Sequence, residues 1–382
     1  MGAGGRVGMR GDLANSVVSW LAGQDMHIFL VGGCVRDELR GMPSHDLDLA
    51  VDGDALGLAR RLANRFGGAY FALDEARGTG RALLRGTGGE RLTVDAARFR
   101  GPDLLADLLD RDFTVNALAA DVRAPERVID PLNGRRDLEM RFIRPVSASS
   151  ISSDPVRALR AVRQAAELDF ALAGETKALI RRDGQALCAV ASERVRDELA
   201  RLLALPVAWP SLELFDDLGL LTLLFPELEP MRQLSQSPPH HLDAFDHALA
   251  TVRWLEQLLC ALEPPGPSPE RMAPGDVPER RPSVGIPHMA SLAPFAARVQ
   301  RHLGIDMGGT RIRGLSLKLA ALLHDTGKPG ARSVEEDGRI RYFGHAVASA
   351  EIASATMRQL RFTRSEIRLV RTVVQHHMRP LF

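Results

Sequence analysis

The sequence predicts an α+β fold, with a mixed sheet and helices in the first third of the chain and helices almost alone thereafter. Short apolar or alternating runs separated by glycine-rich turns indicate strands in the first third. From Asp154, stripes of Leu and Ala at helical spacing continue to about Leu224, and they resume at about Leu315. A chain of 382 residues is long enough for two or three domains of this kind.

Local patterns justify the elements of the first third in order. His27–Val31 is a short apolar run, and in Asp46–Val51 apolar residues alternate with polar ones, as in a strand with one buried face. Asp54 is a good N-cap for a helix that ends near Phe66. The remaining elements are three short strands and one short amphipathic helix, over 69–73, 81–85, 91–97 and 102–110 respectively.

Asp46 and Asp48 form the pattern that points most directly to chemistry, because a strand here places both carboxylates on one face. Two such carboxylates can hold two divalent cations roughly 3.5–4 Å apart, which serves phosphoryl or nucleotidyl transfer. The preceding turn, Gly32-Gly33, can direct backbone N–H groups at a phosphate. A bare pair of aspartates is more often a solvated strand end, but with this turn it predicts a nucleotide site. Asp95 could reach the same side, or be only an edge-strand carboxylate.

Composition restricts the class of protein. The chain is 45% hydrophobic and 25% charged, as in ordinary globular proteins, and its net charge of +1 does not argue for bulk nucleic-acid binding. Three widely spaced cysteines argue against a disulfide framework or zinc ribbon and fit a reducing cytoplasm. No apolar run reaches the roughly 18 residues of a membrane span, so we expect no membrane partner and a cytoplasmic location. Eight arginines between 157 and 201 indicate either a phosphate-binding strip or the solvated face of several helices.

Six motifs in a fixed order together resemble a known family. They are LVGGCVRD, HDLDLAV, DRDFTVNALA, DPLNGRRDL, SDPVRALRAVRQAAELDF and SERVRDEL. The series is similar to that of the class II tRNA nucleotidyltransferases (CCA-adding enzymes) and the bacterial poly(A) polymerases, and the similarity covers roughly residues 28–203. It implies a polymerase-β-like nucleotidyltransferase head followed by a helical neck and body that bind tRNA.

The resemblance assigns roles to particular residues. Asp46 and Asp48 would be the catalytic carboxylates that bind Mg²⁺. Arg111 and Asp112 would meet the ribose, and Asp154 and Arg157 would read the base. The complete set implied to bind nucleotide is Gly32, Gly33, Arg36, Arg111, Asp112, Asn116, Asp154, Arg157, Arg160 and Arg163.

Local patterns place the two residues of this implied base-reading pair side by side. Asp154-Pro155 predicts a helix start with Asp154 as N-cap, which places Arg157 one turn on and on the same face. A carboxylate beside a guanidinium can pair with the Watson–Crick edge of cytosine or adenine. Without the other motifs, a helix cap and a surface charge would be the preferred explanation of the two residues. The sequence departs from the family at Ser153, where Glu is usual, and at Asp110, where Arg is usual.

The last third contains histidines around a His-Asp dipeptide and resembles the HD domain, a metal-dependent phosphohydrolase module. The resemblance implies a divalent transition metal such as Mn, Ni or Co, whose bound water would attack a phosphate ester. An HD fold usually continues to a further ligating aspartate, so we expect a module truncated at its C-terminal end. The implied ligands are His247, His324, Asp325, His345 and His377.

These inferences predict a head over 1–145, a neck and body over 146–235, and an HD-type domain over 236–382 with a Pro-rich insertion over 263–288. The expected reaction is template-independent addition of CMP and AMP from CTP and ATP to the 3′ end of tRNA. Four alternatives remain open: a poly(A) polymerase, an enzyme that adds only CC or only A, a phosphohydrolase acting on nucleotides or RNA ends, and a non-catalytic RNA-binding protein.

Overall fold

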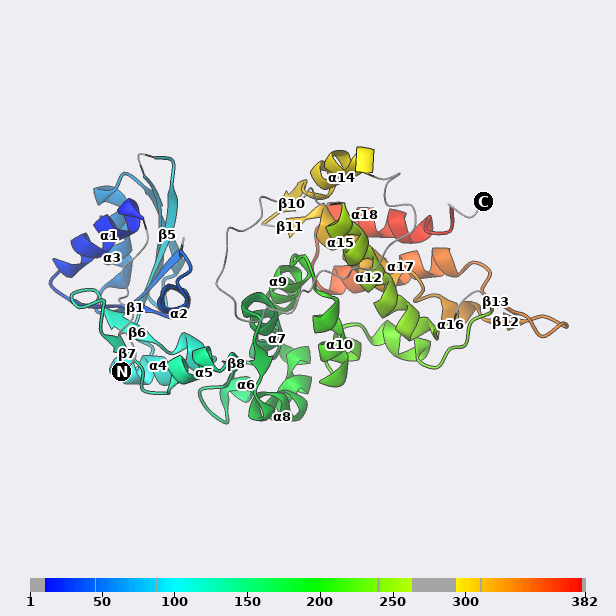
Figure 1. Cartoon of the computed structure of the whole chain (residues 1–382), viewed down its shortest axis with the longest axis horizontal. Coiled ribbons are helices and arrows are strands. Elements are labelled where there is room, and N and C mark those ends of the chain that lie inside the picture. The colour runs from blue at the N-terminus through cyan, green and yellow to red at the C-terminus, as the bar shows by residue number, and fades with distance from the viewer. Residues whose placement is uncertain are drawn as a thin grey trace. The chain divides into compact units, whose positions relative to one another are not determined.

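The computed structural model describes residues 11–44, 46–86, 88–238, 241–262, 293–309 and 311–379 (Figure 1). The chain divides into two units. The first comprises residues 1–157 and 168–180, and the second comprises residues 158–167 and 181–382. The predicted Pro-rich insertion at 263–288 lies outside the described residues.

The first unit contains a seven-stranded mixed sheet in the order β3-β4-β5-β2-β1-β6-β7. β2 and β5 are parallel, and all other neighbouring strands are antiparallel. The five strands expected from the sequence, β1 to β5, all form, with bounds within two residues of those predicted. The strands are β1 His27–Val31, β2 Asp46–Asp52, β3 Ala69–Asp74, β4 Thr79–Arg85, β5 Arg91–Arg98, β6 Ala119–Asp121 and β7 Val128–Ile129.

One face of this sheet is covered by α1 (Asp12–Ala22) and α3 (Ala55–Arg65), as Figure 1 shows. Their apolar side chains pack on the inward residues of β1, β2, β4 and β5 to form a buried core. Asp54 caps α3 as predicted, since its Oδ1 accepts a hydrogen bond from Gly57 N at 2.8 Å. The opposite face is covered over β1 and β2 by a smaller core that includes Leu108 of α4 (Leu104–Leu109).

Shorter elements complete the first unit. They are α2 Gly33–Leu39, η1 Thr114–Asn116, α5 Gly134–Glu139, β8 Phe142–Ile143, α6 Ser150–Ser153, β9 Ala171–Leu172 and α8 Gly174–Asp183. β8 and β9 are parallel partners, and this pairing joins residues 168–180 to the first unit.

The second unit is helical except for two short hairpins in its described part. Its centre is formed by α12, α15, α17 and α18, which bury residues such as Val252, Leu319 and Val370. None of the described helices has the length and apolar character needed to cross a bilayer. The elements are α7 Arg157–Leu168, η2 Gly184–Ala189, α9 Ser192–Leu203, α10 Trp209–Asp217, α11 Leu221–Leu224, η3 Pro226–Met231, α12 Ala244–Ala261, η4 Ala293–Phe295, α14 Ala296–Leu303, β10 Asp306–Gly308, β11 Arg311–Ile312, α15 Arg313–Leu323, α16 Lys328–Ala331, β12 Ser333–Val334, β13 Ile340–Arg341, α17 His345–Gln359 and α18 Arg364–Gln375.

The helix predicted to start at Asp154 forms as α7. Asp154 has extended backbone angles and ends the short helix α6, and α7 begins only at Arg157. The backbone N–H of Arg157 donates to the Asp154 carbonyl at 2.9 Å, which closes a turn between the two helices. Extended angles and a carbonyl that accepts from the third residue along the chain are features of an N-cap position, so the backbone at Asp154 agrees with the predicted helix start.

Candidate functional sites

Three carboxylates share the face of the head sheet that lies opposite the α1 and α3 core. β2 carries Asp46 and Asp48, and its register with β5 places Asp48 directly beside Asp95, as the alternation of β5 predicted. Asp95 is itself bound by Arg81 of β4, whose Nε and Nη2 donate to the two carboxylate oxygens, each at 2.7 Å. Sequence reasoning missed Arg81, since only the pairing of β4 with β5 brings it to Asp95.

Burial raises the pKa of Asp48 to about 6. The Arg111 charge opposes this rise, and the nearby Asp95 and Asp46 carboxylates add to it. A carboxylate that is costly to ionise by itself is stabilised by a bound cation. Oxygen donors from Asp46 and Asp48 on one strand face therefore fit a divalent cation such as Mg²⁺.

The glycine turn after β1 lies against this site. Gly32 has a φ of 74°, a conformation that glycine adopts without strain. A Cβ at this position would lie 2.8 Å from Arg111 Nη1 and 3.6 Å from Asp48 Oδ2, so the turn, the guanidinium and the carboxylate are in direct proximity. Gly33 follows as the first residue of α2.

Arg111 is held in place by a residue that sequence reasoning missed. Its Nε and Nη2 donate to Oδ2 of the buried Asp107 at 3.2 and 3.0 Å. This pair leaves Nη1 directed toward the Gly32 turn. The spacing of four residues between Asp107 and Arg111 is a detectable signal of such a pair on a helical segment.

A series of hydrogen bonds between side chains positions Arg36. Its Nη1 donates to Asn116 Oδ1 at 2.7 Å, and Asn116 Nδ2 donates to Asp112 Oδ1 at 2.9 Å. Arg36 also forms a two-point ion pair with Asp37. Asn116 and Asp112 are buried, at 7% and 8% exposure. The structure thus joins three of the predicted nucleotide-binding residues in one network, and their contact with a ribose or triphosphate stays a prediction.

Arg157 lies beside Asp154 as expected, with Nε 4.0 Å from Asp154 Oδ2. Its guanidinium is nevertheless buried and donates to backbone carbonyls, to Asp110 O at 2.7 Å and to Ser150 O at 3.3 Å. Arg157 therefore also connects the start of α7 to the segment that precedes Arg111.

Arg160 and Arg163 belong to the second unit, where both bind Glu198 of α9. Arg160 Nε lies 2.9 Å from one carboxylate oxygen of Glu198, and Arg163 Nε lies 2.6 Å from the other. Arg163 also pairs with Glu167. Glu198 is only 5% exposed, so the two predicted nucleotide-binding arginines are fixed by a carboxylate that sequence reasoning did not single out.

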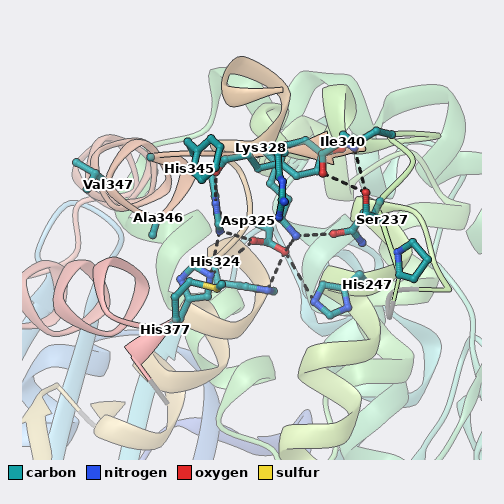
Figure 2. Close-up of a pocket in the computed structure, with 17 residues that line it drawn as sticks. Ser237, His247, His324, Asp325, Lys328, Ile340, His345, Ala346, Val347 and His377 are labelled. Carbon is teal, nitrogen blue, oxygen red and sulfur yellow. Dashed lines mark hydrogen bonds and ion pairs between the residues drawn. The ribbon is translucent and has the colours of Figure 1, made fainter. Parts of the chain in front are cut away.

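The predicted HD residues come from four helical segments and converge on Asp325 (Figure 2). The His324 and His345 Nε2 atoms lie 3.1 and 3.4 Å from its carboxylate oxygens, and those of His377 and His247 lie 3.7 and 3.8 Å away. The ligand atoms form two sets that share Asp325, one with His247 and His324 and one with His345 and His377. They line a pocket of about 660 Å³.

Backbone carbonyls orient three of these imidazoles. Nδ1 of His324, His345 and His377 lies 2.8, 2.7 and 2.6 Å from the carbonyl three residues earlier in each case. A proton on Nδ1 satisfies that carbonyl and leaves Nε2 as a metal ligand directed at Asp325. Burial and the neighbouring histidines lower the pKa of His377, which favours the neutral, ligating form. The donor set therefore fits a divalent transition metal.

Comparisons with known proteins identify the families to which the parts of the chain are similar. Models of protein families match three stretches: the poly(A) polymerase head domain over 28–144, the probable RNA and SrmB-binding site of polymerase A over 169–232, and the HD domain over 286–382. An A-adding tRNA nucleotidyltransferase of Deinococcus radiodurans is 36% identical over 355 residues, which cover 91% of this chain and 68% of that protein. The chain belongs to the tRNA nucleotidyltransferase family.

One further relative and one solved structure are also similar to this chain. The CC-adding enzyme of Thermus thermophilus is 36% identical over 357 residues, covering 92% of this chain and 68% of that protein. A solved structure of the Thermotoga maritima CCA-adding enzyme complexed with tRNA matches with a TM-score of 0.61 at 21% identity, covering 98% of this chain and 73% of that one. The α+β fold, the HD domain and the assignment to this class of enzyme are confirmed. Domains of these two types imply dependence on divalent metal ions.

Proposed function

We propose that this chain adds CMP and AMP from CTP and ATP to the 3′ end of tRNA, in a reaction that requires Mg²⁺. The observation that carries the proposal is the placement of Asp46 and Asp48 on the open face of the head sheet, with the Gly32 turn and Arg111 against Asp48. This is an arrangement of carboxylates, backbone and guanidinium that suits a nucleoside triphosphate with bound cations.

In this proposal Asp46 and Asp48 hold the cations, which supply activation of the terminal RNA hydroxyl and neutralise charge on the α-phosphate. Arg111 reaches the triphosphate from its anchor on Asp107, and Arg36 does so from its anchor on Asn116. The base is read by Asp154 and Arg157. The remaining predicted contacts, with triphosphate, ribose or RNA, are made by Gly32, Gly33, Asp112, Arg160 and Arg163.

The division into a head over 1–145, a neck and body over 146–235 and an HD-type domain over 236–382 belongs to this proposal, as does a cytoplasmic location. Support for tRNA and for both nucleotides comes from the relatives, which are named for A addition, CC addition or CCA addition. Because these names differ in the nucleotide that is added, base choice needs a direct test.

The test is incorporation of each labelled nucleotide alone, and of CTP with ATP, into tRNAs that lack the last three, two or one nucleotides of CCA. We expect two C additions, then one A, then a stop. Addition of C only or A only would identify a partial enzyme, and an open-ended A tail would identify a poly(A) polymerase. If none of these products forms, the result would agree with a non-catalytic RNA-binding protein.

The carboxylate assignment has a matched control on the same strand. Asp46→Ala should lower incorporation at least 100-fold, because it removes a ligand from the proposed metal site. Asp52→Ala, at the exposed end of β2, should leave incorporation within about twofold. Near-normal turnover by the Asp46 variant would overturn the assignment.

The geometry of the HD pocket favours a second activity, hydrolysis of phosphate esters of nucleotides or RNA ends with a transition metal such as Mn, Ni or Co. The supporting observation is the convergence of four histidines on Asp325 in a pocket large enough for a nucleotide. Release of phosphate from nucleoside monophosphates should require added metal and should fail in His345→Asn. The exposed His302→Asn is the control and should retain the activity.

A further inference from the structure

The sheet face that carries the aspartates does not end at β2 but continues across β5, β4 and β3. Two rows of side chains cross these strands. In one row Asp48 lies beside Asp95, Asp95 beside Arg81, and Arg81 beside Phe71. The other row consists, in order across the strands, of Asp46, Thr93, Leu83 and Ala69. Each row therefore begins at a proposed cation ligand.

The far end of this face is apolar and open. Phe71 is 48% exposed and Leu83 is 40% exposed, although Leu83 lies on an inner strand of the sheet. Their neighbours on the other face, such as Ala82 and Leu84, are fully buried under α3. The alternation of the strand pattern thus leaves large apolar side chains on the face that also carries the carboxylates.

Positive charge borders the apolar surface. Arg85 of β4 pairs in register with Arg91 of β5, and both are exposed. Neither has an ion-pair partner among the residues that the structure describes, whereas the charge of Arg81 is balanced by Asp95. Apolar surface for bases together with unpaired guanidinium groups for phosphates is the chemistry of a single-stranded nucleic-acid surface.

The dimensions agree with a short strand of RNA. Neighbouring strands lie about 4.8 Å apart, so Leu83 is about 10 Å from Asp46, two strands away, and Phe71 is about 15 Å from Asp48, three strands away. Stacked nucleotides advance about 3.4 Å each, so this distance accommodates roughly three or four of them.

We propose that Phe71, Leu83, Arg85 and Arg91 form an acceptor platform, a surface on which the 3′-terminal nucleotides of the RNA lie with their last hydroxyl at Asp46 and Asp48. The inference rests on the proposed nucleotidyl transfer and names the surface that positions its acceptor. RNA is favoured over a protein partner because a protein seated here would cover the rows that lead to the carboxylates.

The first test compares variants by steady-state kinetics with tRNA and CTP. Because base stacking on such side chains is a sizeable part of single-strand binding, Phe71→Ala with Leu83→Ala should raise the KM for tRNA about tenfold. The KM for CTP should change less than twofold. The control is Leu105→Ala with Met140→Ala, two exposed apolar residues of the same unit that lie outside the strands of the platform, and it should change neither constant. Platform variants that behave like this control would overturn the inference.

A second measurement does not depend on turnover. A tRNA with 4-thiouridine in its last two positions should cross-link, on illumination, to peptides that contain β3 and β4 in the full chain. Arg85→Gln with Arg91→Gln should weaken tRNA binding and reduce its dependence on salt. Cross-links confined to other peptides would overturn the platform. It would also be overturned if sedimentation showed that the wild type is a dimer and that the platform variants dissociate it. Absence of incorporation by the wild-type chain would overturn the proposed function alone, since the cross-link still tests the surface.

Discussion

In the head without metal, the ionised carboxylate of Asp48 lowers the free energy of unfolding, and replacing this residue should remove that penalty. Burial raises its pKa from 3.8 to about 6, so at neutral pH folding must ionise a carboxyl in a place that disfavours the charge. At 1.36 kcal/mol per unit of pKa, the penalty is about 3 kcal/mol. Asp48→Asn removes the charge and keeps the shape of the side chain, so it should stabilise the head without metal.

The pH dependence separates this effect from any other consequence of the substitution. Below pH 3.8 the carboxyl is protonated in both the folded and unfolded states, and it costs nothing. Between pH 3.8 and 6 the unfolded chain loses its proton before the folded chain does, so the free energy of unfolding of the wild type falls as the pH rises. The advantage of Asp48→Asn should therefore widen by about 2 kcal/mol between pH 4 and pH 7.5 and change little above that.

The assay is amide hydrogen exchange of peptides from β1 and β2, because it reports the unfolding free energy of the head alone in a chain of two units. Samples contain a chelator, and Asp52→Asn, at the exposed end of β2, is the control that should show no widening. Added Mg²⁺ should stabilise the wild type and not Asp48→Asn. A stability difference that is the same at pH 4 and pH 7.5 would refute the reasoning.

Three further predictions concern other parts of the chain. Glu198→Gln should lower the unfolding free energy of the second unit by about 3 kcal/mol in urea, because it removes the buried carboxylate that binds two arginines; a loss below about 1 kcal/mol would contradict the pairing. Gly32→Ala should raise the KM for CTP at least tenfold, since its Cβ would meet Arg111 Nη1 at 2.8 Å and its φ is 74°; an unchanged KM would show that the turn is remote from the nucleotide. His345→Asn should weaken Ni²⁺ binding at least tenfold by calorimetry while CTP incorporation stays within twofold, and equal loss of both would contradict two independent sites.

Much of the head could be predicted because its signals are local. β1 to β5 follow from apolar or alternating runs of five to eight residues, and the period of two in β2 places Asp46 and Asp48 on one face whatever the rest of the chain does. The cap of α3 by Asp54 is equally local. The set of histidines around Asp325 was found from its motif, although nothing in the spacing of His247 and His377 shows that they meet.

Tertiary structure alone decided those partners of the functional side chains that are far away in the sequence. Arg81 reaches Asp95 only because β4 pairs with β5 in one register, and Glu198 meets Arg160 and Arg163 only because α9 packs on α7. The guanidinium of Arg157, which is predicted to read a base, also donates to two carbonyls, and its place in the sequence does not show these partners. The sequence determines which faces carry charge, because that depends on neighbours in the chain. Which of these charges form ion pairs with each other depends on the packing of segments far apart in the sequence.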